Sequence, residues 1–112
     1  MNDVTLPHHK LDAYRVALEL LRTVYGTAIR DAEQRQQARK SAKSAARNVA
    51  EAAGRWSRAD KARVYAIARG EVCEACAAVE IAEAVGCAGA EDVAKVNALG
   101  KRLCDMLGRL VG

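Results

Sequence analysis

The stretch from Tyr65 to Ala82, YAIARGEVCEACAAVEIA, decides the fold expected for this chain. Its apolar residues recur at alternating steps of three and four, which is the spacing of a helix that packs along one seam. The members of this seam are Tyr65, Ala68, Val72, Ala75, Val79 and Ala82. Most of them are small, so burial stabilises the helix only where its neighbours approach closely. This favours packing of helix on helix over a sheet.

Three other segments carry the same spacing. Their seams are Leu11, Tyr14, Leu18, Leu21, Tyr25 and Ala28; Ala38, Ala42, Ala45, Val49 and Ala52; and Val93, Val96, Gly100, Leu103, Leu107 and Leu110. Four seams predict four helices, at about 9–30, 32–54, 58–86 and 90–111. Because the connections are short, we expect an all-α, antiparallel up-down four-helix bundle that forms a single domain over residues 1–112.

Residues typical of helix ends separate the seams. Gly54 suits the left-handed conformation that ends many helices. Ser57, followed three residues later by Asp60, is a variant of the capping box that opens a helix. Gly86 and Gly89 flank the last turn.

Length and composition point to a small cytoplasmic domain. The chain has 112 residues, no Phe and one Trp, and no run of about 18 apolar residues that could span a membrane. Its start lacks the basic and apolar regions of a signal peptide. The four cysteines lie in helical sequence rather than in a loop-rich framework, so we expect all of them to be reduced.

The third segment has a second apolar stripe, roughly opposite the first on a helical wheel. It consists of Ile67, Gly70, Glu74, Ala77, Ile81 and Ala84. Exposed alanines need no explanation, but Ile67 and Ile81 favour packing against another subunit, with Ile67, Ala77 and Ile81 as the candidate oligomer interface. Glu74, the only charge in the stripe, must be ion-paired or protonated, or else reach water at its edge.

Charge is unevenly distributed. The segment 34–69 holds ten Lys and Arg residues against two acids, whereas 70–94 holds six acids and no base. The candidate phosphate-contacting residues are Arg35, Arg39, Lys40, Lys43, Arg47, Arg58, Lys61 and Arg63. Three interpretations stand: a solvated helix face, an ion-paired contact with an acidic neighbouring subunit, or a nucleic-acid-binding surface.

Catalytic and metal chemistry finds little support in the sequence. Cys73 and Cys76 share a helix face, and His8, His9 or Cys104 could complete a zinc site, but no second pair has ligand spacing. Packing explains these cysteines better. No phosphate loop, nucleophile elbow or dinucleotide fingerprint occurs. We therefore expect no enzyme, no metal and no cofactor.

Two motifs resemble a known family. NVAEAAGRWS at 48–57 and YAIARGEVCE at 65–74 are similar to the paired motifs N-I-A-E-G-x-G-R-x-S and aromatic-x-x-A-R-G-S-x-x-E of the bacterial four helix bundle proteins, or 23S rRNA intervening-sequence proteins. The matching positions are Asn48, Glu51, Gly54, Arg55, Ser57, Arg69, Gly70 and Glu74. Ala52 replaces the usual Gly of that family, and Glu71 replaces its Ser.

The resemblance implies an up-down bundle that assembles into a ring, typically a homopentamer. It also relates the chain to the accessory variability determinant proteins of diversity-generating retroelements, which are basic rings that bind nucleic acid and a reverse transcriptase. The motif residues suit either ligand binding or a polar network in which Asn48, Glu51, Arg55 and Glu74 hold the second helix against the third.

Two functions follow as hypotheses. The first is a non-enzymatic homo-oligomer that binds nucleic acid, or a nucleoprotein partner such as a reverse transcriptase, through the basic surface of the second helix. The alternative is a structural or protein-interaction module without affinity for nucleic acid.

Overall fold

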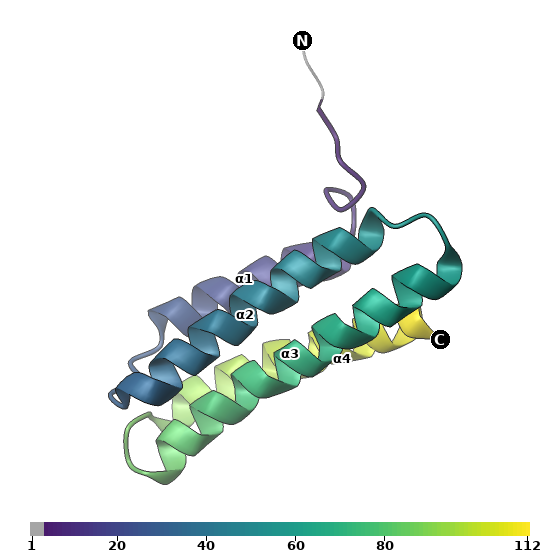
Figure 1. Cartoon of the computed structure of the whole chain (residues 1–112). Helices are drawn as coiled ribbons and strands as arrows, with labels where there is room; N and C mark the ends of the chain where they lie inside the picture. Colours follow the sequence, from purple (N-terminus) through teal and green to yellow (C-terminus); the bar gives the residue numbers. More distant parts are fainter. Residues whose placement is uncertain (1–3) are drawn as a thin grey trace.

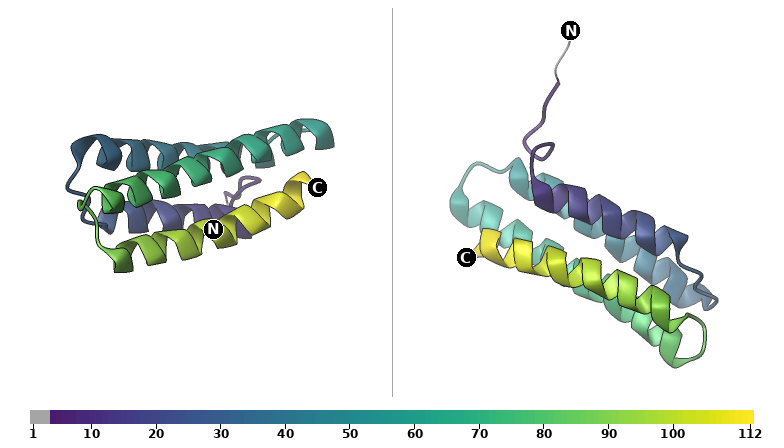
Figure 2. Two further views of the ribbon diagram at one scale, coloured as in Figure 1. Left: turned by 90° about the horizontal axis from the view of Figure 1, so that it is seen from below. Right: turned by 180° about the vertical axis from the view of Figure 1, so that it is seen from behind.

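The computed structural model describes residues 4–112, which form four α-helices and no strand. The helices are α1 (Asp12–Gly26), α2 (Ala32–Ala53), α3 (Arg58–Ala84) and α4 (Ala90–Val111). They lie side by side (Figures 1 and 2), with contacts between α1 and α2, α2 and α3, α3 and α4, and α4 and α1. The predicted all-α class is confirmed.

The seams predicted for α2 and α3 form the centre of the core. All five seam residues of α2 and all six of α3 are buried, from Ala38 to Ala52 and from Tyr65 to Ala82. In α4 the seam is buried from Val93 to Leu107. Leu110, the last seam residue of α4, is 39% exposed, because it lines an open hollow beside Leu11 and Met106.

The prediction of which side of α1 is buried is wrong: the stripe next to the predicted seam faces the core. The residues of α1 that are buried are Ala13, Val16, Ala17, Leu20 and Val24. Leu18 and Leu21 are only partly buried, and Tyr25 is 42% exposed. Both stripes have helical spacing, and the small Ala13 and Ala17 let α1 approach its neighbours, whereas the larger residues cover the edge of the core.

The predicted bounds of the first helix, 9–30, are too wide. Its start is delayed by a turn in which the His9 and Leu11 amides donate to the Leu6 and His8 carbonyls. After Gly26 the chain extends, and the Arg30 amide donates to the Cys87 carbonyl (2.8 Å) in the α3–α4 turn. Arg30 thus ties the α1–α2 turn to the α3–α4 turn, and its guanidinium also donates to the Gly86 carbonyl (2.7 Å).

The other helix ends mostly follow the sequence. The Ser57 hydroxyl accepts a hydrogen bond from the Asp60 amide (3.0 Å), as a cap should. α3 ends at Ala84, two residues before the predicted 86, because Gly86 takes a left-handed turn (φ 78°). The expectation of a left-handed Gly54 is wrong: its φ is −86°, and a side chain, Lys61, caps the helix end instead.

Contacts between α3 and α4 run in opposite order along the two helices. Arg69 donates to the Cys104 carbonyl, and Asn97 donates to Glu80. Between them Gly100 is buried, and a Cβ added there would lie 2.4 Å from the Cys76 sulfur. The missing side chain of Gly100 therefore permits the close approach of these two helices.

The second stripe of α3 faces away from the core. Ile67 and Ile81 are 46% and 49% exposed, and Ala77 is half-buried. Glu74 is also exposed. Within residues 4–112, about half of the surface of each isoleucine is left uncovered.

Candidate nucleic-acid interface

One face of α2 collects cations around a hollow. The hollow has a volume of about 430 Å³ and is lined by Tyr25 of α1, Glu71 of α3, and Gln36, Arg39, Lys40, Lys43, Ser44 and Arg47 of α2. The α2 members recur at steps of three and four, so they share one side of the helix. We call this hollow the basic groove.

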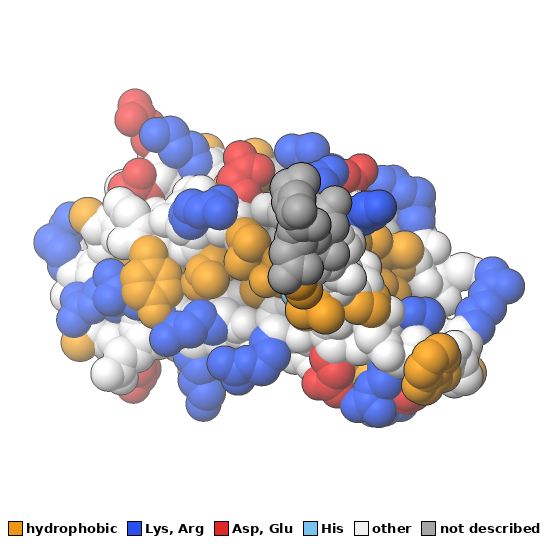
Figure 3. All heavy atoms as spheres, turned by 90° about the horizontal axis from the view of Figure 1, so that it is seen from above, with side chains coloured by type: hydrophobic (Ala, Val, Ile, Leu, Met, Phe, Trp, Pro, Cys, Tyr) orange, Lys and Arg blue, Asp and Glu red, His pale blue; other side chains and the backbone are white. Residues whose placement is uncertain are grey.

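Tyr25 forms a platform at the α1 side of the groove. The Arg39 guanidinium carbon lies 4.5 Å from the centre of the Tyr25 ring, and the Lys43 ammonium nitrogen lies 5.7 Å from it. Both distances are typical of cation–π contacts. The face of Tyr25 therefore holds Arg39 in place without neutralising its charge. Figure 3 shows one face of the molecule, on which a patch of hydrophobic side chains is bordered by Lys and Arg.

The four groove cations keep their donors largely unused. Within residues 4–112, Arg39, Lys40, Lys43 and Arg47 form no salt bridge. The Nε atom of Arg39 is buried and has no acceptor among the described residues, although buried donors are normally paired. The groove thus concentrates positive charge without a matching set of acids.

Glu71 and Glu74 form a carboxyl pair at the α3 edge. The pKa of Glu71 is lowered, first by a hydrogen bond with Glu74, then by one with Ser44 and by the charge of Lys40. The pKa of Glu74 is raised, first by its hydrogen bond with Glu71 and then by the repulsion of that carboxylate. Two carboxyls one helical turn apart therefore titrate as a pair, with Glu74 the more readily protonated member.

Four of the predicted cations lie outside the groove. Arg35 donates to the Ile29 carbonyl (2.9 Å), and Lys61 donates to the Ala53 carbonyl (2.8 Å), so both stabilise the chain locally. Arg63 pairs with Asp60, while Arg58 is exposed and has no ion pair in the described part of the chain. The sequence analysis grouped all eight cations as one surface, whereas the fold places four in the groove, Arg35 at the start of α2, and Arg58, Lys61 and Arg63 at the start of α3.

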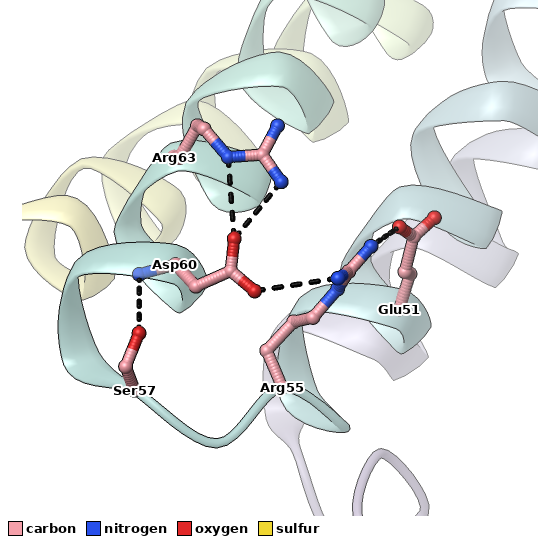
Figure 4. Close-up of polar contacts among 5 residues, drawn as sticks. All are labelled: Glu51, Arg55, Ser57, Asp60 and Arg63. Atoms are coloured by element: carbon pink, nitrogen blue, oxygen red, sulfur yellow. Dashed lines mark hydrogen bonds and ion pairs between the residues drawn. The ribbon is translucent and has the colours of Figure 1, made fainter.

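The α2–α3 turn contains a compact ionic network (Figure 4). Arg55 pairs with Glu51 on one side and with Asp60 (3.3 Å) on the other, and Arg63 pairs with Asp60 (2.9 Å). A hydrogen bond from Arg63, supported by the charge of Arg55, lowers the pKa of the Asp60 carboxyl. Three of the candidate family-motif residues, Glu51, Arg55 and Ser57, therefore fix the turn.

The other motif residues do not form the predicted network. Asn48 donates to the Ser44 carbonyl (2.9 Å) within α2, and Arg69 reaches across to α4. Glu74 forms no salt bridge with an arginine in the described chain, because the α2 residues that share a hollow with it are Gln34 and Gln37. Gly70 is exposed, on the outer stripe of α3.

Sequence reasoning missed four residues of the groove: Tyr25, Gln36, Ser44 and Glu71. Gln36 and Ser44 lie at helical steps from Lys40, so a helical wheel of α2 alone could have found them. Tyr25 and Glu71 come from other helices, and no local pattern links them to α2.

The cysteines lie where α3 meets α4. The Cys73 and Cys104 sulfurs are 3.9 Å apart, and the Cys76 sulfur approaches the Val96 carbonyl. Burial raises the pKa of the Cys76 and Cys104 thiols to about 11. Among residues 4–112, no three His, Cys, Asp or Glu side chains converge as metal ligands would.

None of the helices in residues 4–112 combines the length and the hydrophobicity that crossing a bilayer requires.

The four helices define the chain as a small all-α protein, and the basic groove is a charged feature of its surface. The sequence profile of the 23S rRNA-intervening sequence protein family matches residues 9–109, nearly the whole chain. The protein belongs to this family, as the two motifs predicted. No curated protein matches the sequence.

Proposed function

We propose that this protein is a non-enzymatic, antiparallel four-helix bundle that self-associates and binds nucleic acid through the basic groove. One observation carries the nucleic-acid part: Arg39, Lys40, Lys43 and Arg47 converge on a single hollow without ion-pair partners in the described chain. Holding like charges together destabilises a fold unless an anion joins them, and a phosphate backbone supplies such anions in series.

The expected recognition is directed at the backbone. Lys and Arg contacts to phosphates position a nucleic acid but carry no sequence information. Arg39 lies over the ring of Tyr25, so the ring supports a cation rather than stacking on a base. Binding should therefore depend weakly on sequence and strongly on salt.

Self-association is supported by the outer stripe of α3. Ile67 and Ile81 are about half exposed, with the small Gly70 and Ala77 between them. Apolar side chains in such a row gain from packing on a second copy. A cyclic assembly would place several basic grooves on one particle and so raise the avidity for a long polyanion. The family resemblance implies a pentamer, a cytoplasmic location and a nucleoprotein partner such as a reverse transcriptase.

Binding of labelled generic RNA and DNA, measured by fluorescence anisotropy at two salt concentrations, tests the nucleic-acid function. We expect binding at low salt that weakens at high salt, and its loss in the Arg39→Glu, Lys43→Glu double variant. A matched control is Lys95→Glu with Arg102→Glu, which makes the same charge change on α4, a helix that does not contact α2. Absence of binding at low salt, or equal loss in both variants, would leave the protein-interaction module as the better account.

Light scattering tests self-association. We expect a mass that is a multiple of 12.0 kDa at micromolar concentration, reduced by Ile67→Lys with Ile81→Lys. A monomeric wild-type chain would exclude the oligomer.

A further inference from the structure

Trp56 is the most exposed large hydrophobic side chain among residues 4–112. It lies in the α2–α3 turn with 98% of its surface accessible, and it is the only tryptophan in the chain. Tryptophan offers a large flat surface for stacking. Because the Trp56 side chain is not buried, it does not stabilise the fold, and its role lies in contacts with another molecule.

The turn holds Trp56 in a fixed position. The preceding residue, Arg55, is paired with Glu51 and Asp60, and the following residue, Ser57, caps α3. Lys61 joins the start of α3 to the last carbonyls of α2. A side chain presented from such an anchored backbone loses little conformational entropy when it binds.

The basic groove leads toward this turn. Its α2 members run along the helix from Gln36 to Arg47. Arg47 lies six residues, or roughly 9 Å of helix rise, before Ala53, where α2 ends, and Trp56 follows in the turn. Arg58, two residues after Trp56 in the chain, is exposed and has no ion pair among the described residues. A polyanion lying in the groove and continuing past the end of α2 would meet a cation and an aromatic ring together.

We propose that Trp56 stacks on an unpaired base of a single-stranded nucleic acid whose phosphates occupy the basic groove, an inference that rests on the proposed function. Paired bases inside a duplex are covered on both faces, whereas bases of a single strand can splay onto aromatic side chains. The combination of cationic groove and exposed ring is the one used by proteins that bind single strands without sequence preference. The ligand is then single-stranded RNA or DNA rather than a duplex.

The magnitude of the effect follows from known stacking energies. Removing one base–aromatic stack weakens binding by roughly five- to a hundredfold. Because stacking does not depend on counterion release, the salt dependence should stay the same when Trp56 is removed.

The emission of Trp56 gives a direct readout, since no other tryptophan contributes. The full-length protein is titrated with a thymidine oligonucleotide and, in parallel, with a blunt-ended duplex of the same number of phosphates. Anisotropy of a label on each nucleic acid reports binding independently. We expect both to bind, the single strand more tightly, and only the single strand to quench Trp56.

Variants separate stacking from charge. Trp56→Ala should lose the preference for the single strand and keep the salt slope, while Trp56→Phe retains part of the preference. Circular dichroism checks that both fold, as the exposure of the side chain predicts.

The outcomes distinguish the two levels of the proposal. Equal affinity for both ligands, no quenching and no effect of Trp56→Ala would overturn the stacking site and leave the groove function intact. No binding of either ligand at low salt would remove the groove function, and the stacking site with it. A change of Trp56 emission on protein concentration alone would place Trp56 in a subunit contact and also overturn the inference.

Discussion

Arg47 and Arg55 lie on either side of the last turn of α2, yet their surroundings differ. Arg47 lines the basic groove with three other cations that form no ion pairs in residues 4–112. Arg55 is held between Glu51 and Asp60 in a network that also contains Arg63 (Figure 4). The comparison shows that positive charge alone does not mark a binding surface. A cation with a counter-charge stabilises the chain, whereas a cation without one remains available to a ligand.

The largest difference in affinity for nucleic acid should appear when the same amount of positive charge is removed from the groove and from the α2–α3 turn. Lys43→Ala with Arg47→Ala should weaken nucleic-acid binding by roughly tenfold at low salt and lower the salt slope by about 1.5 to 2, because two phosphate contacts are lost. Lys61→Ala with Arg63→Ala removes the same charge from the turn and should change neither quantity comparably. Anisotropy titrations over a salt series measure both. Equal losses would mean that net charge, not the groove, controls binding.

Substitutions in the α2–α3 turn should change the stability of the fold. Ser57→Ala removes the N-cap of α3 and should lower the free energy of unfolding by about 1 kcal/mol. Urea denaturation measures this change, and binding of a duplex, which depends on the groove alone, should stay unchanged in the folded protein. Ser57→Asp keeps a capping oxygen and serves as the control. A loss of affinity at unchanged stability would contradict the division between the two regions.

A smaller effect is expected at the Tyr25 platform. Tyr25→Ala removes the ring that holds Arg39 and Lys43, and should weaken binding by a few-fold, about 0.5–1 kcal/mol. Tyr25→Phe preserves the ring face and should bind almost as the wild type does. If both variants behave alike, the hydroxyl rather than the ring face matters.

The smallest effect concerns pH. The pKa of Asp60 is lowered in the folded chain, so its ion pairs stabilise the fold above the pKa of an unfolded aspartate and lose this effect as the pH falls through the folded value. The melting temperature of Asp60→Asn should lie slightly below that of the wild type at neutral pH, and the difference should shrink as the pH falls through the lowered pKa of Asp60. A difference that persists in acid would assign the loss to packing instead of charge.

Much of the fold could be predicted because its signals are local. The seams of α2 and α3 and the Ser57 cap follow from spacing and residue type within one helix or turn. The seam of α1 could not, since two adjacent stripes have the same period and only contact with α2 and α4 selects between them. The first helix is also shorter than its pattern suggests, because the chain extends after Gly26 and Arg30 bonds to the α3–α4 turn.

The candidate site was predictable only in part. The cations of α2 follow one another at helical spacing, and the sequence alone identified them. Which cations line the groove and which form the ionic network depends on Asp60, Tyr25 and Glu71, which contact the cations through turns or from other helices.

By itself, the sequence determined the helical class, the family, the inner seams of α2 and α3 and the cationic face of α2, because each depends on residues a few positions apart. The tertiary structure alone decided which stripe of α1 is buried, which cations are neutralised and where Arg39 meets an aromatic ring. Those outcomes depend on side chains brought together by packing, and packing couples residues that no local period connects.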